Sequence, residues 1–295
     1  MKKKYFTSWD DEDSKSKCAE DLAKEILNDP DLPQIKSIVI GAWSVDDMFD
    51  TTPDEIFEMI VSNKEKFQHI ESLFVGAMGF EDCEISWICQ GDYEELLNAL
   101  PNLKSLKIKG ANNRPKKTFK LGKVDHKNLE KLVIKCSGLP VEVVESLKVA
   151  NLPNLKKLVL YLGGPQYGYD CKISDFAALA NKSLFPNLNE LGFVNSKQQD
   201  EIVQVILDSD ILPQLTTIRI SCGCLTDKGG QLILDAAEAG KLSNVKKLDA
   251  EYHYMSGKMM IKLKALPFKV NVSDSQEPHI WREGEEGDMY PMITE

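Results

Sequence analysis

The chain has no apolar stretch long enough to cross a membrane as a helix, which needs about 18 such residues in succession. Residues 1–6 are basic like the start of a signal peptide, but the acidic residues 10–13 follow with no apolar stretch between them. We therefore expect neither a membrane partner nor export through a signal peptide. With 42% hydrophobic and 28% charged residues, the composition is typical of a folded globular protein.

Cysteine pairs and histidine clusters are also missing. The seven cysteines are an odd number, scattered along the chain, and include no Cys-x-x-Cys pair, which argues against a disulfide framework or a zinc site. The four histidines lie far apart and lack the spacing that places two metal ligands on one helix face. We expect free, mostly buried thiols in a reducing compartment, the cytoplasm, and no metal or other cofactor.

What the chain has in abundance is one repeated phrase. Eight times an apolar residue, often with Pro beside it, leads into Leu-x-x-Leu-x-Leu, as in residues 100–108. The middle apolar residues of the eight phrases are Ile38, Leu73, Leu106, Leu132, Leu158, Leu191, Ile218 and Leu248. They recur every 26 to 35 residues, and such a period predicts stacked copies of one supersecondary unit.

Each unit shows two periodicities. The apolar pair that ends the phrase, such as Leu158 and Leu160, is spaced by two, so both side chains leave one face of a short strand toward the core. The segments between these phrases have helical spacing; in residues 53–61, for example, Ile56, Met59 and Ile60 form one stripe. Further helices are predicted over residues 14–28, 93–100, 141–149, 173–184, 201–207, 227–239 and 258–266.

This order of strand, loop and helix predicts an α/β leucine-rich-repeat solenoid. In this horseshoe, parallel strands line the concave face and helices line the convex face. The long units resemble the ribonuclease-inhibitor class of these repeats. We predict an N-terminal capping helix segment over residues 1–31, about eight repeats plus a terminal partial repeat over residues 32–272, and a C-terminal extension over residues 273–295. The extension is either docked through Trp281, Tyr290 and Ile293 or mobile.

The chain departs from one common feature of leucine-rich repeats. Many of them place Asn or Cys three residues beyond the last strand leucine, where the side chain satisfies backbone groups of the neighbouring turn. Here those places are taken by Trp43, Met78, Ala111, Ser137 and Gly163. The sequence therefore predicts no such ladder, and the glycines near the strand ends predict tight turns instead.

Several loops carry a closer resemblance. Residues 81–92, 161–170, 225–229 and 273–278 are similar to those of a family of stand-alone bacterial leucine-rich-repeat proteins. The family has no established biochemical activity. The resemblance therefore implies a fold and a bacterial cytoplasmic setting, and it supplies no catalytic residues.

Charge is concentrated in blocks along the chain. Residues 101–160 carry 14 basic and 4 acidic side chains, whereas residues 1–100 carry 9 and 23. The strand period assigns part of this charge to the concave face. The candidate partner-binding residues there are Lys107, Lys109, Lys131, Lys135, Lys157, Tyr161, Arg219 and Lys247. They predict a docking site for an acidic partner, either an acidic protein segment or phosphate groups. The alternative is that the strands carry lysine only for solubility and against edge pairing.

A second set of candidates lies in the loops that follow the strands. These rim residues are Trp43, Asp46, Glu81, Glu84, Trp87, Tyr167, Asp170 and His253. Aromatic and acidic side chains together suit a protein-binding edge. The alternatives are packing into the core, a bound cation, or acid–base catalysis, although the chain contains no recognised catalytic or metal-binding motif.

Together these features predict a non-enzymatic protein–protein interaction module that acts through its concave face and strand-end loops. The alternatives are a small enzyme or metal-dependent hydrolase that uses the rim carboxylates, or a structural accessory subunit. The net charge of −10 and the few aromatic residues among the lysines argue against nucleic acid. We predict no small-molecule substrate.

Overall fold

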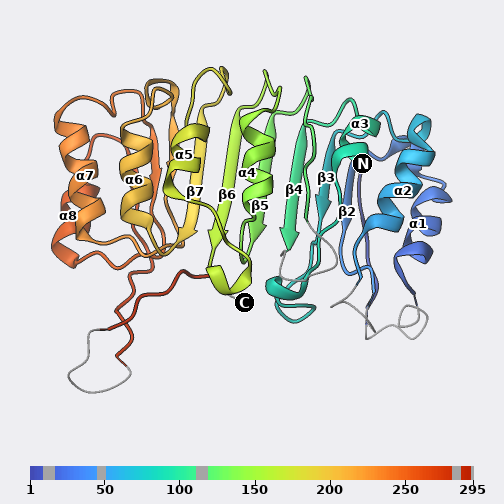
Figure 1. Ribbon diagram of the computed structural model, residues 1–295, viewed down its shortest axis with the longest axis horizontal. Helices are drawn as coiled ribbons and strands as arrows, with labels where there is room; N and C mark the ends of the chain where they lie inside the picture. Colours follow the sequence, from blue (N-terminus) through green and yellow to red (C-terminus); the bar gives the residue numbers. More distant parts are fainter. Residues whose placement is uncertain (9–16, 45–50, 111–118, 281–286, 294–295) are drawn as a thin grey trace.

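The computed structural model describes residues 1–8, 17–44, 51–110, 119–280 and 287–293. Within these residues the chain forms one all-parallel sheet of ten strands whose spatial order is their order in the sequence (Figure 1). The strands are β1 (Lys2–Tyr5), β2 (Ser37–Ile40), β3 (Ser72–Val75), β4 (Ser105–Gly110), β5 (Lys131–Cys136), β6 (Lys157–Gly163), β7 (Glu190–Ser196), β8 (Thr217–Arg219), β9 (Lys247–Asp249) and β10 (Lys269–Asn271).

Eight α-helices in the described residues lie in a row along one face of this sheet (Figure 1). The helices are α1 (Ala19–Leu27), α2 (Asp54–Ser62), α3 (Glu94–Ala99), α4 (Val141–Lys148), α5 (Ile173–Leu179), α6 (Gln199–Leu207), α7 (Asp227–Glu238) and α8 (Gly257–Lys264). Each contains one of the predicted apolar stripes. The opposite face of the sheet carries no helix of the described residues, and we call it the open face.

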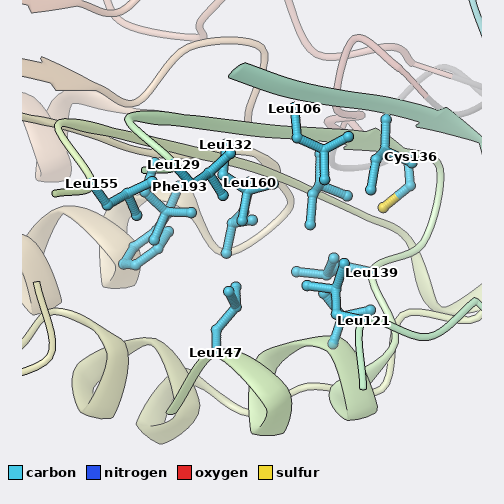
Figure 2. Close-up of a cluster of buried hydrophobic side chains, with 14 of the residues drawn as sticks. Leu106, Leu121, Leu129, Leu132, Cys136, Leu139, Leu147, Leu155, Leu160 and Phe193 are labelled. Carbon is cyan, nitrogen blue, oxygen red and sulfur yellow. The ribbon is translucent and has the colours of Figure 1, made fainter. Parts of the chain in front are cut away.

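The predicted core pairs stack in register across the sheet. Leu106 of β4 is aligned with Leu132 of β5, and Leu132 with Leu158 of β6, and the same column continues from Ile38 to Leu248. Figure 2 shows strand residues of this core facing Leu147 of α4. Because successive strand residues point to opposite faces, the neighbours of each core pair are displayed on the open face.

The N-terminal segment contains a strand that the sequence did not predict. β1 pairs with β2 at the edge of the sheet, and α1 follows it. With Lys2, Lys3 and Lys4 in succession, the strand shows no alternation of apolar and polar residues. Only Tyr5 is buried, and its hydroxyl donates a hydrogen bond to the Asp29 carboxylate at 2.6 Å. A lysine-rich edge strand is protected from pairing with another chain.

An asparagine ladder connects the units at a position for which no prediction was made from the sequence. It lies before the strands instead of after them, and in each step an Asn Nδ2 donates to a backbone carbonyl oxygen of the preceding unit at 2.7–2.9 Å. The donors are Asn102, Asn128, Asn154, Asn187 and Asn244. The signal was present in the sequence, because each Asn stands directly before the second apolar residue of the phrase.

Replacing Asn154 with alanine is expected to lower the free energy of unfolding by about 1 kcal/mol, since the carbonyl of Lys127 loses its donor. Urea denaturation measures the change. Asn98→Ala is the control, because Asn98 is an exposed residue of α3 where alanine favours the helix. Equal behaviour of the two variants would contradict a structural role for the ladder.

Candidate functional site

Four lysines of β4 and β5 form the centre of the open face. They are Lys107, Lys109, Lys131 and Lys135, and we call them the lysine face. Lys109 and Lys135 are direct register partners, and Lys131 is aligned with Ser105, four residues earlier on its strand. Adjacent strands lie about 4.8 Å apart, so the sheet brings these four stems together, as the strand period predicts.

Two aromatic rings border the lysine face. The Nζ atom of Lys107 lies 4.3 Å from the ring centroid of Phe74 on β3, and that of Lys135 lies 5.6 Å from the ring centroid of Tyr161 on β6. Both distances are within the range of a cation–π attraction. The sequence prediction included Tyr161 but missed Phe74, although Phe74 is register partner of Lys107.

The charge of the lysine face is poorly compensated. Burial, together with the positive charges of Lys135, Lys157 and Lys2, holds the pKa of Lys107 below its ordinary value. Burial and Lys135 likewise lower the pKa of Lys109, whose Nζ donates to the carbonyl oxygen of Met78 at 2.5 Å. The surroundings of Lys107 and Lys109 therefore disfavour the charged form of both ammonium groups.

Three predicted cations of the open face belong to a separate, compensated network. Lys157 lies 2.8 Å from the carboxylate of Glu190, and the Arg219 guanidinium bridges Glu190 and Asp249 at 2.5 Å each. Lys247 lies 3.7 Å from Asp249. Burial opposes ionisation of Glu190, but hydrogen bonds from Lys157 and Arg219 outweigh it and lower its pKa. We therefore leave Lys157, Arg219 and Lys247 out of the lysine face.

Two of the predicted rim residues lie in the core. Trp43 is 1% exposed and its indole Nε1 donates to the Thr51 carbonyl at 3.3 Å. His253 is fully buried; its Nδ1 accepts from the Met255 N–H at 3.1 Å and its Nε2 lies 3.3 Å from the Val272 carbonyl oxygen. Burial lowers the pKa of His253. Neither side chain presents area to a partner, which corrects their assignment to the binding edge.

The other rim residues have different surroundings. Asp170 accepts a hydrogen bond from the Val141 N–H at 2.7 Å and so caps α4. Trp87, in the short 3₁₀ turn Ile85–Trp87, is 42% exposed, and Glu81 and Glu84 lie in the same loop. Tyr167 is half-buried in the loop after β6, at the same edge of the sheet (Figure 1). Asp46 lies outside the described residues.

The described residues contain neither a group of metal-ligating side chains nor a membrane-spanning helix. In the ranges that the structure describes, no three His, Cys, Asp or Glu side chains are grouped so that they could hold a metal ion. No helix among those same residues is long and apolar enough to cross a bilayer.

A solved structure resembles this arrangement over nearly the whole length of the chain. It is the crystal structure of a Bacteroides fragilis protein, which superposes with a TM-score of 0.87 and is 41% identical in sequence. The chain belongs to the same family as this protein. The match covers 99% of the chain and 77% of the relative, which is therefore the longer molecule. No protein-family model matches the sequence, and no curated protein does.

Proposed function

We propose that the protein is a leucine-rich-repeat module that binds an acidic segment of a protein partner on its lysine face and performs no catalysis of its own. The repeated strand-and-helix unit, one sheet in sequence order and the ladder between units support the solenoid and its horseshoe shape. The observation that carries the proposal is the gathering of Lys107, Lys109, Lys131 and Lys135 on two adjacent strands, where burial and the charge of Lys135 lower the pKa of Lys107 and Lys109.

Carboxylates of a partner would offset the unfavourable electrostatics of the lysine face. Burial and repulsion disfavour the charged forms of Lys107 and Lys109 in the free protein, and carboxylates placed between the lysines would add attraction. Phe74 and Tyr161 add apolar area beside the charges, which favours a segment that combines acidic and apolar residues. Charge complementarity of this kind supplies specificity and a high association rate.

A protein partner has more support than nucleic acid. The lysine face occupies two strands of ten, and the chain has a net charge of −10. A duplex needs many phosphate contacts and would extend beyond these strands of a chain with net negative charge, whereas a short acidic segment would not. The enzyme alternative has less support, because the carboxylate of Asp170 is engaged as a helix cap.

The setting that we propose is the cytoplasm. None of the seven cysteines, all of which lie in the described residues, forms a disulfide, and five of them are buried. Burial raises the pKa of Cys83 to about 11 and that of Cys224 to about 12, so these thiols stay protonated at neutral pH. Thiols of this kind suit a reducing compartment.

Changing Lys131 and Lys135 together to glutamate is expected to weaken binding of a short fluorescein-labelled polyglutamate peptide by at least about tenfold. The reason is that two attractive charges become repulsive while the sheet stays intact. Fluorescence anisotropy measures the affinity. For the parent protein the affinity should also fall with added salt, since these charges are partly exposed.

Lys258→Glu with Lys262→Glu is the matched control. Both lysines are exposed on α8, and the net charge changes by the same amount. This variant should bind the peptide within about twofold of the parent. Equal losses of affinity in the two double variants would mean that peptide binding depends only on the net charge of the protein, and the docking proposal would fail. Thermal unfolding confirms that each variant is folded.

A further inference from the structure

The C-terminal segment, residues 287–293, lies across the ends of β7, β8 and β9. After β10 the chain turns back along the edge where the strands end, and it finishes near β6 (Figure 1). His279 and Asp288 exchange two backbone hydrogen bonds of 2.8 Å, which direct the returning segment. The segment therefore crosses three units in the direction opposite to their order.

Most of the hydrogen bonds that hold this segment involve its main chain. Asn195, at the end of β7, donates from Nδ2 to the Ile293 carbonyl oxygen at 2.8 Å and accepts from the Ile293 N–H at 2.9 Å. The Met292 N–H donates to the carbonyl oxygen of Cys222 at 2.9 Å. Such contacts recognise an extended backbone whatever its side chains.

Two tyrosines after β9 complete the site. The hydroxyls of Tyr252 and Tyr254 donate to the Tyr290 carbonyl oxygen at 3.1 and 3.0 Å, and the Tyr290 N–H lies 3.0 Å from the Tyr254 oxygen. The Nζ of Lys197 lies 5.9 Å from the Tyr290 ring centroid. Pro291 is buried, whereas the Met292 side chain is 53% exposed. The site thus buries Pro291 and leaves the side chain of Met292 exposed to solvent.

The backbone has the left-handed conformation at one position of four successive units, three of which form the site. Asn195, Cys222, Tyr252 and Asp274 each stand five residues after the first residue of their strand, and they have φ angles of 61°, 63°, 58° and 60°. This left-handed conformation is tolerated by Asn but unfavourable for Cys and Tyr. Because the unit of β10 shares this conformation, it is a property of the repeated turn, and it shapes the strand ends against which the segment lies.

Asn195 supplies an independent argument. Its side chain is fully buried, and the hydrogen bonds of both its amide atoms go to Ile293. Departure of the segment would break both of these hydrogen bonds and expose the amide of Asn195 to water, because the segment itself covers Asn195. The amide of Asn195 is therefore placed to pair with an extended backbone, from this chain or from another.

We propose that the ends of β7, β8 and β9 form a binding site for an extended peptide, that the C-terminal segment is its resident occupant, and that an extended segment of a partner protein replaces it. The chemistry favours a partner sequence like residues 290–293, with an aromatic residue, a buried proline, an open position and a β-branched residue. Because the resident segment is tethered, a partner must compete against a high effective concentration. This site is separate from the lysine face.

The test releases the resident segment in the full chain. Met292→Pro with Ile293→Pro removes the two N–H groups that donate to Cys222 and Asn195, and it leaves the site itself unchanged. The probe is a labelled synthetic peptide of residues 287–293. We expect the released chain to bind the peptide at least about tenfold more tightly than the parent, by fluorescence anisotropy.

Adding Asn195→Asp to the released chain shows where the peptide binds. Aspartate accepts the left-handed backbone but cannot donate to the peptide carbonyl, so we expect the affinity to fall by about tenfold. Failure of the released chain to bind, or binding that Asn195→Asp leaves unchanged, would overturn the proposal and make the segment a fixed part of the fold. Exchange of segments between copies, seen as concentration-dependent dimers of the parent, would overturn the assignment to a separate partner. Neither result affects the lysine-face experiment.

Discussion

Gly163→Ala is expected to lower the free energy of unfolding by more than about 3 kcal/mol, one of the largest effects of any single substitution at a turn of this protein. Gly163 ends β6 with a φ of +76°, and a β-carbon built there would overlap the carbonyl group of Ser137. That carbonyl cannot move freely, because it accepts a hydrogen bond from the Gly164 N–H at 2.8 Å. Equilibrium denaturation in urea measures the loss.

Gly240 provides the matched control for this substitution. Its φ of +74° is nearly the same, but no atom lies within 4 Å of the position of an added β-carbon. Gly240→Ala therefore tests the backbone strain alone, and we expect a cost of about 1 kcal/mol. The difference between the two variants measures the overlap with Ser137. If the two costs were equal, the close packing of the turns after β5 and β6 would be refuted.

Phe193→Ala is expected to cost about 3–5 kcal/mol. Phe193 of β7 is fully buried among the core residues of Figure 2, and its ring centroid lies 5.2 Å from that of Phe176 on α5. Alanine would leave a cavity between the sheet and the helix row that neighbouring units, fixed by strand register, cannot close. Calorimetric and urea unfolding both report the change.

An exposed apolar residue gives the comparison for the core substitution. Val149 follows α4 and is 77% exposed, so Val149→Ala should change the stability by less than about 0.5 kcal/mol. A loss below about 1 kcal/mol for Phe193→Ala would show that this part of the core relaxes around the missing ring, in contrast to the close packing expected of protein interiors.

The leucine pattern was sufficient to predict most of the fold. A spacing of two within each phrase and a helical spacing between phrases are local properties, and the strands and helices formed where they were predicted. β1 was missed because its three lysines carry no apolar period; it is a strand only because β2 offers an edge to pair with. The asparagine ladder was missed because its acceptors lie 27 to 34 residues away in the sequence.

The candidate site was predicted in part, for the same reason. The strand period placed Lys107, Lys109, Lys131 and Lys135 on one face, because the direction of a strand side chain depends only on its position in the strand. It did not separate them from Lys157, whose partner Glu190 comes from the next strand. Whether Trp43 and His253 lie in the core or at the surface depended on the packing of whole units.

The sequence by itself determined the α/β class, the core columns and which strand residues are displayed, since each follows from periodicity within a few neighbouring residues. Only the tertiary structure decided which displayed charges are compensated and that the C-terminal segment fills the site at Asn195. Ion pairs and hydrogen bonds between units depend on register, turn conformation and burial. These properties arise from contacts between residues far apart in the chain, up to 98 positions for Asn195 and Ile293.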